Sequence, residues 1–312
     1  MKSSESLYPN DIESSRTDQI FDRFGPTPRI CIEYQMDREE MRNYEKAVNE
    51  AISRITSTQL DKLLKDGKDL SIDSVSHKIS LLSRESSDDI SSDTTIAPIT
   101  SIIQSRLAVQ IRNMELAEQL RLYQYFSSVP AGRKIAGVFF EALAQKLFQI
   151  NIDIELIPMV KLEKPSSRWN SSHEHLSKNL EPLRQNALSR RFHKSATPLE
   201  TREYKDHNGL KIEKDIFYIP AAANEEAFDS FIVLDNDLFI FQFTISHVHD
   251  IKPGFIEFFG KCKPESVPRK ENWKLVFVIA PNMILKSPNL KNLPDLKLFS
   301  TVVSDDKLVG VV

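Results

Sequence analysis

The sequence predicts an α/β fold in which a helical N-terminal connector leads into a mixed β-sheet flanked by helices. Apolar residues recur at helical spacing at about 38–64, 101–126 and 131–150. Residues 228–245, FDSFIVLDNDLFIFQFTI, have the β-branched and aromatic content of a two-stranded hairpin. Residues 273–280, WKLVFVIA, form a near-continuous apolar run, which is typical of a strand buried on both faces.

The bulk composition limits the class of protein. The 312 residues leave room for about two domains, and the formal net charge of -3 gives no global basic field for a nucleic-acid partner. Cys31 and Cys262 lie far apart and form no metal or disulfide pattern, which favours a reduced intracellular setting. No apolar run approaches the ~20 residues of a membrane span, and the polar, acidic N-terminus is not a secretory signal peptide. We therefore expect no membrane partner, and the oligomeric state stays open.

The first hundred residues divide by composition. Residues 1–22 are predicted to be a disordered tail because they have little to bury. Residues 24–32, FGPTPRICI, contain two prolines and predict a rigid turn that leads into a strand or extended segment. The first predicted helix follows and closes the segment 23–67 at Gly67. Residues 68–100 are rich in serine and aspartate, which favours a flexible linker over a functional acidic tract. The remaining residues, 101–312, would hold a second helix and the sheet domain.

The helix predicted at 131–150 carries a candidate site residue. Phe140 and Phe148 extend its apolar surface beyond one face, so we expect it to be buried on most sides. Glu141 is then a carboxylate where water is scarce, and such a group needs a cation or a hydrogen-bonding partner. A structural ion pair with Lys134, two turns earlier, is one interpretation, and a bound metal ion is the other.

A predicted strand at 152–160 is followed by a polar stretch, 163–210, which we expect to be a disordered insertion. His173 and His175 in this stretch are too close and too isolated to predict a zinc site. Its basic cluster either contacts phosphates or forms a solvated loop face, and comprises Arg184, Arg190, Arg191, His193 and Lys194.

The hairpin carries the second group of candidates. Its second arm alternates, so that Gln242 and Thr244 share the face opposite Phe241 and Phe243. Asp229 is the polar residue of the first arm, before an acidic turn at 235–237. A carboxylate facing a polar pair is a layout that can hold a divalent metal at a sheet edge. The alternative is that Asp229 ends a loop and Gln242 is a hydrogen-bonded structural residue.

The order helix, strand, insertion, hairpin, helix, strand resembles the core of the PD-(D/E)XK nuclease superfamily. In that family a helical glutamate, a hairpin aspartate, and an acidic residue and a lysine on the next strand converge at a sheet edge. Glu141 and Asp229 match the first two positions, whereas Gln242 and Thr244 depart from the last two. The resemblance implies Mg²⁺ or Mn²⁺ held by Glu141, Asp229 and Gln242, because hard divalent cations bind oxygen ligands. It places Asp229, Gln242 and Thr244 at the catalytic positions. Proximity in the sequence alone suggests that His247 or Lys252, or the nearby His249 or Lys261, assists them.

Three stretches, FGPTPRICI, AGRKIAGVFFEALAQ and FDSFIVLDNDLFIFQFTISHVHDI, resemble the C-terminal part of Crinkler-type effectors and of the related retrotransposon hot spot proteins. In that group a P-loop NTPase precedes a nuclease-like domain, so residues 23–67 would be a remnant of the NTPase lid. No GxxxxGK[ST] motif occurs, so we expect no NTPase activity, and the chain resembles a truncated paralogue. The resemblance implies a secreted effector that acts in the host nucleus; otherwise an intracellular location is expected.

Two functions follow from these patterns. The first is a metal-dependent, nuclease-like domain that acts on DNA phosphodiesters. The second is a catalytically inactive module that binds nucleic acid or a host protein through the basic cluster at 184–194. DNA is the expected partner of the first, with a separate NTPase chain or a host protein as further possible partners.

Overall fold

The structure, a computed structural model, describes residues 14–32, 37–56, 76–84, 94–149, 153–161, 169–170, 188–191, 199–221, 228–247, 249, 251, 254–281, 283, 285–287 and 296–303. The chain divides into two units. The N-terminal unit comprises Met1–Gln110 and Ser128–Ile135, and the sheet unit comprises Ile111–Ser127 and Ala136–Val312.

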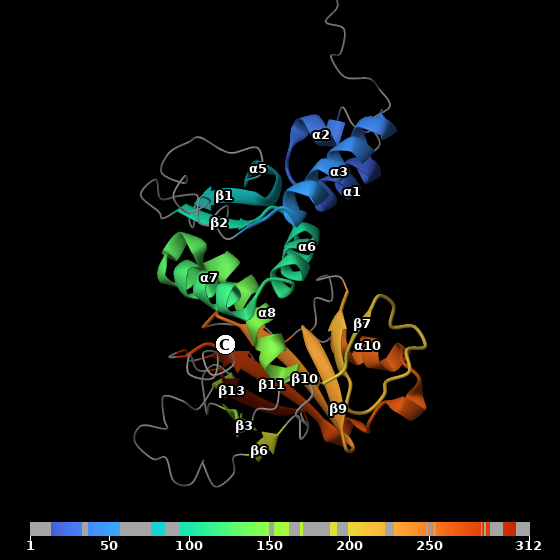
Figure 1. The fold of residues 1–312 in the computed structure, drawn as a ribbon. Coiled ribbons are helices and arrows are strands. Elements are labelled where there is room, and N and C mark those ends of the chain that lie inside the picture. The colour runs from blue at the N-terminus through green and yellow to red at the C-terminus, as the bar shows by residue number, and fades with distance from the viewer. Residues whose placement is uncertain are drawn as a thin grey trace, which may run out of the picture. The chain divides into compact units, whose positions relative to one another are not determined.

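The N-terminal unit starts with two helices, α1 (Ser14–Phe24) and α2 (Pro28–Ile32) (Figure 1). Gly25 ends α1 with a φ of 91°, a backbone conformation that favours glycine, and its N–H donates to the Phe21 carbonyl at 2.7 Å. Pro28 takes the first position of α2, where a missing N–H is tolerated. Two predictions are therefore wrong. Residues 14–22 of the expected disordered tail are helical, and the residues after Pro28 are not extended.

Helix α3 (Arg38–Ser53) confirms the first predicted helix over these residues. Asp37 caps its N-terminus, because its side chain accepts hydrogen bonds from the N–H groups of Glu39 and Glu40 at 2.8 and 3.0 Å. The predicted continuation towards Gly67 lies largely outside the described residues.

Asp37→Ala is expected to lower the free energy of unfolding by about 1 kcal/mol, because two N–H groups of the first turn lose their acceptor. Urea unfolding measures this change. Asp22→Ala, which alters an exposed residue inside α1, is the control and should cost less than about 0.5 kcal/mol. Equal losses for the two substitutions would contradict the capping role.

The segment predicted as a linker contains regular structure. Helix α5 (Ser76–Ile79) leads into β1 (Ser80–Arg84), which pairs antiparallel with β2 (Thr94–Pro98). Ile79 and Ile96 are buried, so these short apolar segments anchor the pair to the N-terminal unit. The prediction of a continuous linker is thus wrong at 76–84 and 94–98, because the average composition concealed two short β-forming runs.

The second predicted helix is in fact two helices, α6 (Ser101–Arg112) and α7 (Leu116–Ser128). At the break between them the buried Gln119 side chain donates to the Met114 carbonyl at 2.8 Å. A short 3₁₀ turn, η2 (Pro130–Gly132), then precedes α8 (Arg133–Gln149), which confirms the third predicted helix. None of the helices in the described part of the chain is both long and apolar enough to cross a membrane.

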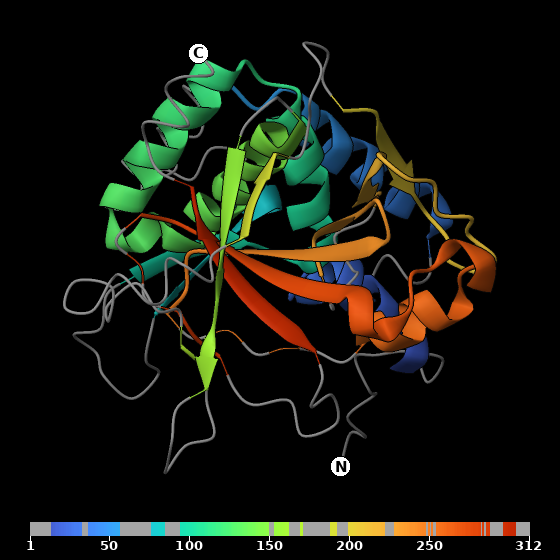
Figure 2. The ribbon, with the colours of Figure 1, turned by 90° about the horizontal axis from the view of Figure 1, so that it is seen from below.

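The sheet unit confirms the predicted mixed sheet flanked by helices. Its strand order is β6-β3-β13-β11-β10-β9-β8-β7, and β10, β11 and β13 are mutually parallel. Figure 2 shows the strands fanning across the sheet, as expected from strand twist. The strands are β3 (Asp153–Pro158), β6 (Leu188–Arg191), β7 (Thr201–Tyr204), β8 (Phe217–Pro220), β9 (Ser230–Leu234), β10 (Asp237–Thr244), β11 (Trp273–Ile279) and β13 (Lys297–Val302), while β4 (Val160–Lys161), β5 (Trp169–Asn170) and β12 (Lys286–Ser287) form a small separate sheet.

Two helices of the sheet unit cover opposite faces of this sheet. The ring of Phe148 on α8 lies 4.6 Å from that of Phe241, measured between centroids, so α8 covers the face of Phe241. Ile240 points the other way and belongs to a core with Phe255 and Phe258 of α10 (Gly254–Lys261). Short 3₁₀ turns η4 (Pro264–Ser266) and η5 (Lys270–Asn272) connect α10 to β11.

The pairing of the strands is a finding that the predicted order of elements did not specify. The strand predicted at 152–160 exists as β3, but it pairs with β13 and β6, away from the hairpin. The hairpin's neighbours in the sheet are β8, which pairs with β9, and β11, which pairs with β10. The end of the predicted disordered insertion, residues 199–210, forms β7 and a turn, with Tyr204 buried.

Candidate active site

Glu141 lies in the middle of α8. Apolar neighbours on both sides of the helix, among them Phe139, Phe140 and Ala144, are buried, as the sequence predicted. Glu141 itself keeps some solvent exposure. The Oε1 atom of Glu141 accepts a hydrogen bond from Gln145 Nε2 at 3.2 Å, one turn along the helix. The structure therefore places a carboxylate in an apolar helix with one amide donor beside it.

Asp229 lies directly before β9, where the hairpin ladder ends. Its N–H donates to the Phe241 carbonyl at 2.9 Å, which continues the pairing of β9 with β10. Its side chain then folds back, and Oδ2 accepts the Phe243 N–H at 2.6 Å. The carboxylate thus occupies the position that the next ladder carbonyl would take. The Asp229 carbonyl instead accepts from Gln145 Nε2 at 3.4 Å.

The two carboxylates are close enough to influence each other's ionisation. Burial raises the pKa of Glu141 to about 7, while the nearby Arg112 and the Gln145 hydrogen bond act in the opposite direction. Burial and the charge of Glu141 raise the pKa of Asp229 well above its usual range, opposed by the Phe243 N–H. Two mutually repelling carboxylates at a strand end are an arrangement that a divalent cation stabilises.

Gln242 does not approach this pair from the side of α8. By strand alternation it lies on the α10 face, with Ile240. It is only 5% exposed, and within the described residues its Oε1 atom has no hydrogen-bond partner. No contact in that part of the chain joins it to Glu141. The paired register of the hairpin ends at Phe241 and Ser230, and the Asp229 N–H also bonds the Phe241 carbonyl, so Asp229 is not paired with Gln242.

Thr244 is also buried and lies on the same face of β10 as Gln242. Its Oγ1 atom accepts a hydrogen bond from the Ser246 N–H at 3.0 Å, so the hydroxyl helps the chain to turn after the strand. The structure therefore gives Thr244 a local structural bond.

The other predicted assistants are scattered. His247 is exposed, and the His249 ring lies 6.0 Å from the Phe277 ring on the α10 face. Lys261 forms an ion pair with Glu257 at 2.6 Å, and Lys252 lies outside the described residues. Two residues of the predicted basic cluster, Arg190 and Arg191, belong to strand β6. The other three, Arg184, His193 and Lys194, lie outside the described residues.

The positive charge beside the site comes from a residue that the sequence did not indicate. Lys134 is exposed, and Arg112 at the end of α6 is the cation that acts on Glu141. Lys274 is buried, but it contacts Asp237 at the opposite end of β10. Gln145 was also missed, although its place four residues after Glu141 predicts that the two side chains meet. No short sequence pattern predicts the role of Arg112, because its contact with Gln145 joins α6 to α8.

The donor set can be tested against a metal ion. Within the described ranges no group of three or more histidine, cysteine, aspartate or glutamate side chains could hold one. Two carboxylates are nevertheless enough for Mg²⁺, which commonly keeps several water ligands. The buried Gln242 Oε1 has no hydrogen-bond donor within the described residues, but it lies on the α10 face, whereas Glu141 and Gln145 approach Asp229 from α8. Glu141 and Asp229 therefore fit a hard cation, whereas no contact among the described residues brings Gln242 to them.

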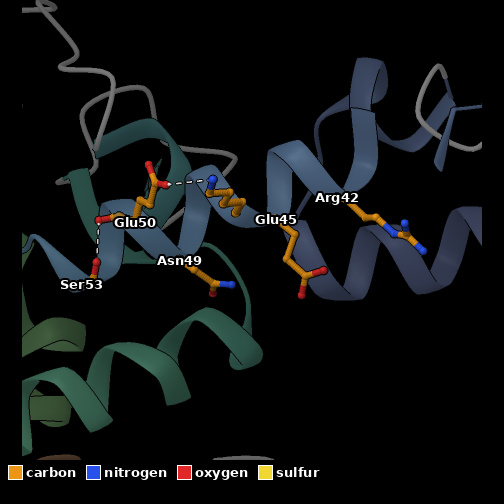
Figure 3. Close-up of a pocket in the computed structure, with 6 residues that line it drawn as sticks. Arg42, Glu45, Asn49, Glu50 and Ser53 are labelled. Atoms are coloured by element: carbon orange, nitrogen blue, oxygen red, sulfur yellow. Dashed lines mark hydrogen bonds and ion pairs between the residues drawn. The ribbon is translucent and has the colours of Figure 1, made fainter. Parts of the chain in front are cut away.

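A separate hollow of about 500 Å³ lies along α3 in the N-terminal unit (Figure 3). Its charges largely cancel, and they pair within the unit: Lys46 with Glu50 at 4.0 Å, and Glu45 with Arg106 at 3.5 Å. Such a balanced face is typical of a solvated helix surface. The carboxylate pair of the sheet unit remains the stronger candidate.

Comparisons of this chain with protein-family models, with curated proteins and with solved structures find no match.

Proposed function

We propose that the sheet unit binds Mg²⁺ or Mn²⁺ between Glu141 and Asp229 and acts as a metal-dependent, nuclease-like domain on DNA phosphodiesters. The observation that carries this proposal is the meeting of two acidic residues at one amide group: Gln145 Nε2 on α8 donates to Glu141 Oε1 at 3.2 Å and to the carbonyl of Asp229, at the start of β9, at 3.4 Å. Charge repulsion at a partly exposed strand end costs free energy that a bound cation would recover.

The chain's connectivity also supports the proposal. The succession α8, hairpin β9–β10, α10 and β11, with β11 parallel to β10, has the order that the PD-(D/E)XK resemblance implies. Asp229 also lies at the carboxyl ends of the parallel strands, the edge at which open α/β sheets commonly bind ligands. The restriction-endonuclease-like fold and the likeness to Crinkler-type proteins are parts of this proposal.

The chain's own groups suit hydrolysis near neutral pH. In the metal-free site burial raises the pKa of Glu141 to about 7, so this carboxyl group can release its proton near neutral pH and become a charged ligand. When bound, the cation would acidify water and stabilise the charge that develops on the phosphate. Asp229 is held by the Phe243 N–H, so its carboxylate is oriented before any cation arrives. Without a lysine at Thr244, we expect slow cleavage.

A second function is favoured by the same departure from the family pattern. Thr244 makes a local hydrogen bond, and Gln242 lies on the opposite face from α8. Both features suit a module that has lost cleavage and binds DNA or a host protein. The basic cluster proposed for that binding lies largely outside the described residues.

Incubation of the purified chain with supercoiled plasmid, in Mg²⁺, Mn²⁺ or EDTA, distinguishes the two functions. The first predicts nicking that requires the cation, at a rate that rises with enzyme concentration. The second predicts a gel shift of the same DNA without nicking, under all three conditions. A result with no nicking and no gel shift would contradict both functions as far as DNA is concerned.

A further inference from the structure

Gln145 connects the two halves of the candidate site. It is fully buried, and its Nε2 atom donates to Glu141 Oε1 at 3.2 Å and to the Asp229 carbonyl at 3.4 Å. One amide group therefore joins a helix carboxylate to the backbone of the strand residue that carries the other carboxylate. Because Glu141 and Gln145 both belong to α8, separation of α8 from the start of β9 would lengthen the bond from Gln145 Nε2 to the Asp229 carbonyl.

Arg112 fixes which way this amide points. Its Nη1 atom donates to Gln145 Oε1 at 3.3 Å. If the amide rotated by half a turn, its oxygen would face two acceptors, Glu141 and the Asp229 carbonyl, and its NH₂ group would face a guanidinium that can only donate. The guanidinium is itself held from the other side, because Nη2 lies 3.8 Å from Glu203 Oε1 on β7.

We propose that Arg112 and Gln145 are positioning residues for the cation site, in which Arg112 orients the Gln145 amide and the amide holds Glu141 beside Asp229. This inference rests on the proposed function and extends it. Arg112 also supplies positive charge from α6, whereas the family pattern places a lysine at the position of Thr244. The site would then keep charge compensation without an ammonium group on the hairpin.

Gln145→Leu removes the amide while nearly preserving its volume. Outer partners of metal ligands commonly contribute 10- to 100-fold to affinity, so we expect Mn²⁺ binding, measured by calorimetry, to weaken by about that factor. Gln119→Leu is the matched control. Gln119 is equally buried in the same unit and hydrogen-bonds the Met114 carbonyl, so its loss should lower stability but change Mn²⁺ affinity less than about 2-fold. Equal weakening by both substitutions would overturn the proposal.

We refer to the chain of contacts from Arg112 through Gln145 to Glu141 as the relay. Replacement of Arg112 tests its first step, the orientation of the Gln145 amide. Arg112→Lys keeps a cationic donor and should retain more Mn²⁺ affinity than Arg112→Met. The side-chain NH₂ signals of Gln145 in a ¹⁵N-correlated NMR spectrum, assigned by their absence in Gln145→Leu, report the orientation directly. They should be dispersed in the natural chain and in Arg112→Lys, and collapse towards the positions of exposed glutamines in Arg112→Met.

The NMR measurement separates this inference from the proposed function. If the natural chain binds no Mn²⁺, the proposed function fails, and the relay is judged by the Gln145 signals alone. If those signals are the same in the natural chain and in Arg112→Met, the relay is wrong even where Mn²⁺ binds.

Discussion

Replacing Asp229 or Glu141 with alanine is expected to abolish cation-dependent nicking of DNA, with a loss of at least about 100-fold in rate. Each carboxylate is one of the two charged oxygen ligands on which the proposed cation depends, and loss of a metal's charge stabilisation is worth several kcal/mol in the transition state. Gel densitometry of nicked plasmid over time in Mg²⁺ and Mn²⁺ measures this effect.

Asp206→Ala is the control for this experiment. Asp206 is an exposed carboxylate of the same unit that accepts the Asn208 N–H at 2.9 Å, in a turn after β7. Its loss should leave nicking unchanged within about 2-fold. Nicking that survives Asp229→Ala at the natural rate would show that the cleavage site is elsewhere or that the activity comes from a contaminant.

Glu141→Gln is expected to stabilise the metal-free protein at alkaline pH and to have little effect at low pH. The pKa of Glu141 is raised from its ordinary value of 4.5 to about 7, so the folded state binds a proton more tightly than the unfolded chain. The natural protein therefore loses stability as pH rises from about 4.5 to 7, while the glutamine variant does not. At about 1.4 kcal/mol per pH unit, the difference reaches on the order of 3 kcal/mol above pH 7.

Urea unfolding in EDTA at pH 5 and pH 8 measures this difference. Glu257→Gln should behave in the opposite sense, because Lys261 lowers the pKa of Glu257, and the exposed pair contributes its stability above the ordinary pKa of a glutamate. Addition of Mg²⁺ should stabilise the natural protein and narrow the gap to Glu141→Gln at pH 8. A Glu141→Gln variant that is equally destabilised at both pH values would show that Glu141 serves as an ion-pair partner.

The meeting of Glu141 and Asp229 was predictable because both residues stood out locally. One was a carboxylate in an apolar helix, and the other was the polar exception at the start of a hairpin arm. Strand alternation also separated Gln242 from Phe241 and Phe243. The sequence could not tell which of these faces α8 would cover, because both faces of β10 are apolar. The Phe148 ring settles this, since it packs on Phe241 and Phe243.

Other parts of the structure depend on contacts that short sequence windows do not contain. Arg112 reaches the site only because α6 ends at Arg112 instead of continuing to Phe126. The side chain of Asp229 replaces a ladder carbonyl, which no periodicity predicts. Strand β3 pairs with β13, more than a hundred residues later in the chain, and so it takes the far side of the sheet although it directly follows α8.

Diffraction from a crystal of the protein soaked in Mn²⁺, recorded to exploit the anomalous signal of manganese, measures the central claim most directly. We predict one anomalous peak with carboxylate oxygens of both Glu141 and Asp229 within about 2.5 Å, and no peak in Asp229→Ala. An ion-free site at millimolar Mn²⁺, with the Glu141 carboxylate turned instead onto the Arg112 guanidinium, would contradict the account.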